Sequence, residues 1–207
     1  MVRSRITRGA GWLAMALLVA GIAGCRVRVD KDANGKEKTV QVDMPFGGVH
    51  VNTDQTTAAD VGLPSYPGAV AVKDDEHKSA DVHMGFGEWQ LRVRAVNLES
   101  PDGRDKVMDY YKQAMARYGD VLVCQNHQPV GTPKVTSQGL TCEDNEKGAK
   151  MEIDGRKNGV MDRTQLALKA GSKRHQHIVG FEDPQNGRTR FVLVALDLPA
   201  GSDGKSD

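Results

Sequence analysis

The most constraining feature of this sequence is a run near its C-terminus, Phe191–Leu196, in which every residue is apolar. A strand with one face in water alternates apolar and polar residues, so a run that is apolar at both parities indicates burial on both sides. Other segments alternate with period two and are separated by Gly-, Asn- and Pro-containing turns. We therefore expect Phe191–Leu198 to be the central strand of a sheet that is covered on each face.

One segment of the chain has the pattern of a helix. Ser100-Pro101-Asp102 supplies a capping hydroxyl, a proline at the first helical position and an acid in the first turn, and Gly119 supplies a stop. We expect one amphipathic helix at about residues 102–118, packed on one face of a mainly antiparallel sheet, which is the α+β class. Just before it, the alternation of Trp89–Ala95 changes phase at Val96, which predicts a bulge.

The N-terminal part of the body is expected to form a small β-hairpin unit. Residues 26–52 alternate apolar and polar positions around Asn34-Gly35, a dipeptide that favours a hairpin turn because both residues tolerate positive φ. The polar stretch Asn52–Asp60 has the composition of a linker. We expect the hairpin to dock on the second face of the sheet. If it does not, Val192 and its neighbours form an exposed patch that indicates a partner.

The charge balance argues against a nucleic-acid partner. The formal net charge is +1, and the first 24 residues hold three arginines and no acid. The remainder therefore carries 25 basic and 27 acidic residues, and such a near-neutral body has no electrostatic attraction for phosphates. Apolar residues make up 39% of the chain, enough for a folded domain rather than a disordered chain.

The first 25 residues indicate export. Three arginines precede the apolar stretch Trp12–Ile22, which is of signal-peptide length and too short to span a bilayer. The run Ile22-Ala23-Gly24-Cys25 resembles the lipobox of bacterial lipoproteins, with Ile22 in place of the usual leucine. That resemblance implies cleavage after residue 24 and lipidation of Cys25. Arg26, which follows, favours the outer membrane where one is present. A plain secretory signal or an uncleaved anchor is the alternative.

The cysteine count fits this interpretation. There are three cysteines, and lipidation of Cys25 leaves Cys124 and Cys142 to pair in an oxidising envelope. Each of the two shares a strand face with a leucine two residues earlier, Leu122 or Leu140. We expect a disulfide between Cys124 and Cys142. A pair of metal-binding or redox thiols is the alternative, although no Cys-x-x-Cys motif is present.

Two groups of residues resemble parts of metal sites. Asp30-x-Asp32-x-Asn34 has the alternating oxygen ligands of a calcium loop, but the bidentate glutamate expected at the twelfth position is a glutamine. His175 and His177 fall on one strand face at the spacing of a metal pair, but no third ligand is identifiable. We expect a hairpin turn and solvated histidines instead, with no metal and no cofactor.

The sequence contains none of the common catalytic motifs. The chain has no Gly-x-Ser-x-Gly elbow, His-Glu-x-x-His helix or phosphate-binding glycine loop. Arg92, Arg94 and Lys169 could form a basic patch on an exposed sheet face, although a solvated face balanced by acids is the simpler interpretation.

The body of the chain also resembles a known group of proteins. Pro64-Ser65-Tyr66-Pro67-Gly68-Ala69, followed by a helix with Tyr110-Tyr111, is similar to a group of uncharacterised bacterial envelope lipoproteins with a Tyr-Pro-Gly-Ala motif. The likeness covers about residues 63–124. It implies no activity, cofactor or catalytic residue.

These observations give the expected organisation of the chain. Residues 1–24 are a signal peptide, 25–57 a lipidated strand-and-turn segment with a linker, 58–200 an α+β domain and 201–207 a disordered tail. We expect a membrane-anchored envelope lipoprotein with a non-catalytic binding or scaffolding role and a protein or glycan partner. A membrane-tethered, hydrolase-like enzyme without a recognisable motif remains the alternative, because site residues can meet only in space.

Overall fold

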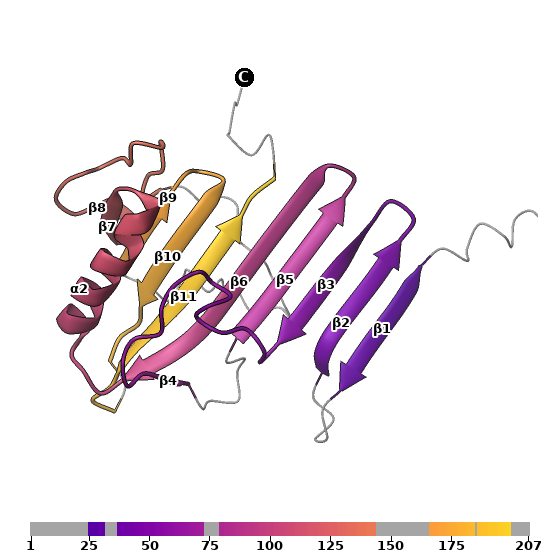
Figure 1. Cartoon of the computed structure of the whole chain (residues 1–207), viewed down its shortest axis with the longest axis horizontal. Helices are drawn as coiled ribbons and strands as arrows, with labels where there is room; N and C mark the ends of the chain where they lie inside the picture. Colours follow the sequence, from indigo (N-terminus) through magenta and orange to yellow (C-terminus); the bar gives the residue numbers. More distant parts are fainter. Residues whose placement is uncertain (1–24, 32–36, 73–78, 144–165, 185, 200–207) are drawn as a thin grey trace, which may run out of the picture.

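Strands dominate the computed structural model, which describes residues 25–31, 37–72, 79–143, 166–184 and 186–199 (Figure 1). Eleven of them form one sheet in the order β1-β2-β3-β5-β6-β11-β10-β9-β7-β8, with β4 paired to β6, and every pairing is antiparallel. Their bounds are Arg26–Lys31 (β1), Glu37–Met44 (β2), Gly47–Thr53 (β3), Val70–Ala71 (β4), Ser79–Phe86 (β5), Trp89–Ser100 (β6), Val121–Gln125 (β7), Gln128–Pro129 (β8), Leu166–Gly171 (β9), His175–Phe181 (β10) and Thr189–Asp197 (β11). Strands account for 54% of the described residues and helix for 11%, so the predicted α+β class is wrong and the fold is mostly β.

The N-terminal hairpin does not form a separate unit on the second face of the sheet, which corrects the expectation from sequence. Strands β1, β2 and β3 extend the sheet at its edge, because β3 pairs with β5 from Gly47 opposite Phe86 to Thr53 opposite Ala80. An edge strand offers a row of unpaired backbone groups, and pairing there satisfies them without burying an apolar face. The stretch expected to be a linker is also part of the fold, since Thr56 and Ala58 within it are buried.

The helix is shorter than predicted at both ends. Helix α2 spans Arg104–Met115 and is followed by a 3-10 turn, η2, at Ala116–Tyr118, which Gly119 ends with a φ of 110°. The predicted cap, Ser100, is instead the buried last residue of β6, and its hydroxyl oxygen accepts the N–H of Asp102 at 3.1 Å. The serine therefore shapes the turn before the helix rather than the first turn itself.

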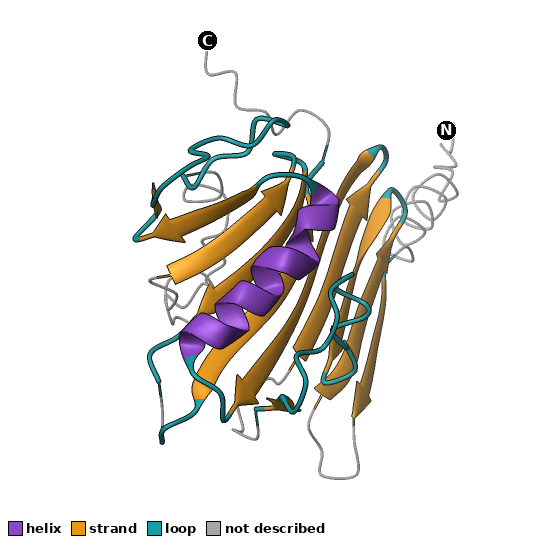
Figure 2. Cartoon of the chain, turned by 60° about the vertical axis from the view of Figure 1, so that its left-hand side comes forward, coloured by secondary structure: helices purple, strands orange, loops and turns teal. Residues whose placement is uncertain are grey.

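The main core lies between α2 and one face of the sheet, here called the helix side (Figure 2). Val107, Tyr111 and Met115 project from α2 at helical spacing and are fully buried. The loop between β3 and β4 adds more apolar side chains to the same core. The buried residues that share it on the sheet are Val96, Leu98, Leu168, Ala170, Val179, Phe181, Phe191, Leu193 and Ala195. The loop is therefore a structural layer beside the helix.

The Tyr-Pro-Gly-Ala turn and the tyrosine pair of α2 meet in this core. The Tyr66 hydroxyl donates to the Asp102 carboxylate at 2.6 Å, which raises the pKa of Tyr66 to about 12 and lowers the pKa of Asp102. The Tyr66 ring packs edge-on against Tyr110 with centroids 5.1 Å apart, and the Tyr111 hydroxyl donates to the Pro64 carbonyl at 3.2 Å. These contacts join the loop to the helix, so the motif has a structural role.

The opposite face of the sheet, here called the far side, carries a second apolar cluster. Ala95, Ala167, Ile178, Val192 and Val194 form it and are all buried. Because β11 also contributes Phe191, Leu193 and Ala195 to the core on the helix side, the predicted central strand buried on both faces is confirmed.

Strand β6 contains no bulge at the predicted position, since its pairing with β5 and β11 runs without a register shift. The change of phase has a different cause. In the first half of β6 the apolar residues face the far side, whereas Val96 and Leu98 in the second half meet the helix-side core. One strand thus crosses from a single-layer part of the sheet into the covered part. In the single-layer part, the described side chains of β1, β2 and β3 are all exposed or only half-buried.

Candidate functional site

The proposed lipidation site lies at an accessible position. Cys25 is the first described residue, directly precedes β1 at the edge of the sheet, and has an exposed side chain with a free thiol. Residues 1–24, on which the signal-peptide interpretation depends, lie outside the described residues, as does the tail at 201–207. Lipidation of Cys25 therefore stays a prediction.

The predicted disulfide between Cys124 and Cys142 is confirmed, with an S–S distance of 2.01 Å and a Cα–Cα distance of 5.6 Å. Both half-cystines are buried with Leu122 and Leu140 in a small cluster. The Lys169 ammonium, which is also buried, donates to the Cys142 carbonyl at 2.7 Å. The disulfide therefore holds the loop after β8 against the far side of β7 and β9. Residues 139–142, which were expected to form a strand, take part only in isolated bridges.

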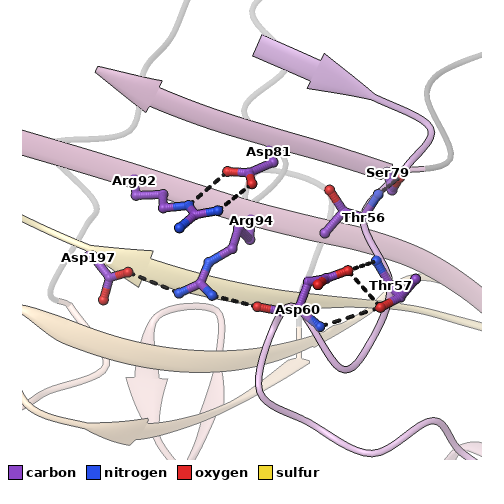
Figure 3. Close-up of polar contacts among 8 residues, drawn as sticks. All are labelled: Thr56, Thr57, Asp60, Ser79, Asp81, Arg92, Arg94 and Asp197. Carbon is purple, nitrogen blue, oxygen red and sulfur yellow. Dashed lines mark hydrogen bonds and ion pairs between the residues drawn. The ribbon is translucent and has the colours of Figure 1, made fainter. Parts of the chain in front are cut away.

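A polar cluster on the helix side joins Arg92, Arg94, Asp60, Asp81 and Asp197, and is here called the arginine cluster (Figure 3). The Arg92 Nε and Nη2 donate to the two oxygens of Asp81 at 3.0 and 2.6 Å. The Arg94 Nη2 donates to Asp197 at 3.0 Å, and its Nη1 donates to the Asp60 backbone carbonyl at 2.5 Å. The cluster links β5, β6 and β11 to the loop after β3.

Hydrogen bonds within that loop fix its approach to the sheet. The Asp60 carboxylate accepts the Thr57 backbone N–H at 2.8 Å and the Thr57 hydroxyl at 2.7 Å, and these bonds lower the pKa of Asp60 (Figure 3). The Thr56 N–H donates to the Ser79 hydroxyl on β5 at 3.0 Å. The loop is thus tied to two neighbouring strands, β5 and β6.

The arrangement favours a structural role for the arginine cluster. Both of its guanidinium groups are ion-paired, and the hydrogen bonds that Arg92 donates to the Asp81 carboxylate raise the pKa of Arg92. Pairs this exposed contribute about 0–1 kcal/mol each, so they orient the loop more than they stabilise the fold. Arg92 and Arg94 do not form a basic patch with Lys169, because that lysine lies on the far side, where its ammonium contacts the Cys142 carbonyl. The balanced face is the interpretation that agrees with the structure.

The two histidines considered as metal ligands share a strand face but have different surroundings. The His175 Nδ1 lies 3.0 Å from the Asp197 carboxylate and is exposed, which agrees with a solvated strand end. His177 stacks on Tyr118 with ring centroids 3.6 Å apart, and burial lowers its pKa. Gly62 makes this stack possible, because a Cβ there would lie 3.1 Å from the His177 ring and 2.8 Å from the Tyr118 hydroxyl. His177 is therefore a half-buried histidine with a packing role.

The calcium-loop candidates are only partly visible. Asp30 is an exposed residue of β1, whereas Asp32 and Asn34 lie outside the described residues. Within the described ranges, no group of three or more His, Cys, Asp or Glu side chains is placed to hold a metal ion. His50 and His83, side by side on β3 and β5, have ring centroids 6.4 Å apart, and the His50 Nε2 lies 3.8 Å from Asp43.

The acidic partners of the arginines were missed at the level of sequence, although a signal for one of them was present. The turn Gly87-Glu88 separates the two flanking strands by two residues, which fixes their register. Counting outward from it places Asp81 opposite Arg94 and diagonal to Arg92. The contact with Asp197 had no such signal, because 103 residues separate Asp197 from Arg94.

Among the described residues, no helix is long and apolar enough to cross a membrane. No protein-family model matches the chain, and neither a curated protein nor a solved structure resembles it significantly.

Proposed function

We propose that this chain is a lipid-anchored protein of the bacterial cell envelope with a non-catalytic binding or scaffolding role. In this proposal residues 1–24 direct export, Cys25 carries the lipid, and the sheet domain faces the periplasm to meet a protein or glycan partner. Arg26 in the position after Cys25 favours anchoring in the outer membrane where one is present.

The observation that carries the proposal is the division of the three cysteines. Cys124 and Cys142 are joined in a buried disulfide, and such bonds persist in oxidising compartments such as the envelope. Cys25 is the remaining thiol of the chain, and it is exposed at the start of the edge strand, where a modifying enzyme can reach it. Several acyl chains on one residue anchor a protein firmly, since each buried methylene contributes about 0.8 kcal/mol.

The test is metabolic labelling with a fatty-acid probe in a bacterial host. The wild-type chain should take up the label and sediment with membranes, and Cys25→Ala should lose the label and leave the membrane fraction. The matched control is the double substitution Cys124→Ala with Cys142→Ala, which should keep the label because Cys25 is intact. Equal labelling of Cys25→Ala and wild type would refute the proposed anchor.

The membrane assignment has its own test. Density-gradient separation should place the wild-type protein with the outer membrane. Asp in the position after the lipidated cysteine is associated with inner-membrane retention, so Arg26→Asp should move the protein to the inner-membrane fraction. An unchanged distribution would refute the assignment based on Arg26.

A further inference from the structure

We infer that three exposed aromatic side chains, Phe46, Phe86 and Trp89, insert into the membrane surface beside the lipid on Cys25. This inference rests on the proposed anchor at Cys25 and names the surface through which the domain meets the membrane. The three residues are here called the apolar tip. They come from the turn between β2 and β3 and from the two ends of the turn between β5 and β6.

Strand register brings the apolar tip and the anchor to the same end of the sheet. Arg26, the residue after Cys25, pairs with Asp43, one residue before β2 ends. Gly47, the first residue of β3, pairs with Phe86, which in turn pairs with Trp89. The Gly87 N–H donates to the Phe46 carbonyl at 3.2 Å and ties the two turns together. Figure 1 shows the start of β1 and both turns at one end of the strands.

Phe46, Phe86 and Trp89 are the exposed phenylalanine and tryptophan side chains among the described residues. Of the five Phe and Trp residues after residue 24, Phe181 and Phe191 are buried in the core. The other three form the apolar tip, where Phe46 is 87% exposed, Phe86 43% and Trp89 41%. Aromatic residues are enriched at membrane–water interfaces because their rings settle at the depth of the lipid headgroups.

The local geometry of the two turns leaves the rings of the apolar tip exposed. Gly47 allows the close approach of β3 to the end of β5, since a Cβ there would lie 2.0 Å from the Gly85 carbonyl oxygen and 2.7 Å from the Phe86 Cδ1. The Phe86 and Trp89 rings lie side by side, with centroids 6.0 Å apart. Phe46 occupies the second position of a two-residue turn, where its side chain is exposed to solvent.

The apolar tip continues into the far side of the single-layer strands. Most alternate residues there are apolar and none of these is buried, whereas Lys38 and Thr53 lie on the same face at the end away from the tip. The apolar residues are Val27, Val29, Val40, Val42, Met44, Val49, Val51, Val82, Met84, Leu91 and Val93. A surface that is apolar from the tip onward suits the boundary between headgroups and acyl chains, where amphipathic elements lie.

Arg26, Asp43 and Glu88 at this end of the sheet carry one positive and two negative charges, which points to apolar insertion rather than to attraction by anionic headgroups. Arg26 lies opposite Asp43, and Glu88 lies in the turn beside Trp89. Attraction to anionic headgroups is therefore weak, and the contact should depend little on salt. Covalent attachment through Cys25 would supply the proximity that three side chains alone do not.

The experiment uses the mature lipidated protein in vesicles of phosphatidylethanolamine and phosphatidylglycerol. Removal of residues 1–24 takes away Trp12 and leaves Trp89 as the one tryptophan of the chain, so its fluorescence reports on the tip. Vesicles containing lipids brominated in the acyl chains should quench Trp89 by about twofold or more, as expected for a ring at the acyl boundary. The control is the pair Trp89→Phe with Val135→Trp, which moves the probe to an exposed loop position at the other edge of the sheet and should not be quenched.

A second pair of variants keeps the test independent of folding. Phe46→Ser should reduce the quenching of Trp89, and Val135→Ser should leave it unchanged. Both positions are exposed, so neither change removes a buried contact. Equal circular dichroism spectra would verify that both variants fold.

The outcomes separate this inference from the proposed function. Labelling of Cys25 together with quenching of Trp89 supports both. Labelling without quenching overturns the insertion and leaves the anchor standing. Unquenched emission that shifts to shorter wavelength with protein concentration would show that a second copy covers the tip, which also overturns the insertion. Absence of label on Cys25 removes the anchor and the inference together.

Discussion

Removal of the disulfide should destabilise the domain through the unfolded state. The Cys124–Cys142 bridge closes a loop with a sequence separation of 18 residues. For a loop of that size the chain-entropy model gives about 3 kcal/mol. Alanine at both positions keeps the buried cluster with Leu122 and Leu140 apolar, so loss of the cross-link should dominate the change. We expect the double variant to unfold with a free energy lower by about 3 kcal/mol.

Urea unfolding of the mature chain, followed by circular dichroism, measures this loss directly. The slope of free energy against urea should rise in the double variant, since an unfolded chain without a cross-link exposes more surface. Leu140→Ala is the comparison, because it leaves the disulfide intact. That change should cost about 2–5 kcal/mol through a cavity, without altering the slope. A loss below about 1 kcal/mol for the double variant would refute the entropic account.

Three further predictions concern the loop between β3 and β4 and the core beneath it. Gly62→Ala should lower the free energy of unfolding by about 1–3 kcal/mol, because its φ is 81° and a Cβ would lie 2.8 Å from a tyrosine hydroxyl. Gly68→Ala, at a φ of 76° in open space, should cost only about 1 kcal/mol, and equal losses would contradict the steric argument. Tyr66→Phe should lower the midpoint of unfolding in the same assay, since the hydroxyl donates to the Asp102 carboxylate; an unchanged midpoint would count against that bond. Burial lowers the pKa of His177 in the folded state, so its contribution to stability should be present above about pH 6.5 and lost as the pH falls toward the folded pKa. The free energy of unfolding should therefore fall more steeply with decreasing pH in the wild type than in His177→Gln. Parallel pH profiles of the two proteins would exclude this contribution.

Local patterns predicted the parts of this fold that local physics determines. The run at Phe191–Leu196 identified a strand buried on both sides, because period-two geometry assigns each side chain to a face. Helical spacing located α2, and Gly119 marked the end of the following turn. The disulfide followed from the cysteine count once Cys25 was assigned to lipidation, and the strand-face pattern of the leucines agreed with it, since the two cysteines and two leucines meet in one cluster.

The pairing of distant strands could not be predicted in the same way. Alternation within β1, β2 and β3 shows that two faces differ, but it does not show which edge the hairpin joins. The pairing of β3 with β5 depends on backbone groups that every residue carries. The phase change at Val96 was misread for a related reason, since it reflects which tertiary layer covers each half of β6.

The arginine cluster shows the same limit for a candidate site. Its two arginines were visible in the sequence, and the hairpin register could have placed Asp81 beside them. Asp60 and Asp197 contact Arg94 because tertiary structure places the loop after β3 and the end of β11 beside β6. The pairing of Arg94 with these two residues could therefore not be predicted from local sequence alone. The apolar tip is a comparable case, because the sequence does not show that its two turns lie at the same end of the sheet as Cys25.

The single-layer construction of β1, β2 and β3 sets an order of opening for the domain. Within the part of the chain that the structure describes, each of these strands pairs with its neighbours and has no buried side chain. Their amide hydrogens should therefore exchange with solvent at rates that decrease stepwise from β1 to the layered strands β6 and β11. Opening from the edge inward releases one strand at a time and leaves the packed core closed. Contact of the apolar tip with a membrane would slow amide hydrogen exchange in the outermost strands first. The strands that open most readily in the free domain would therefore be stabilised most by the membrane to which the domain is tethered.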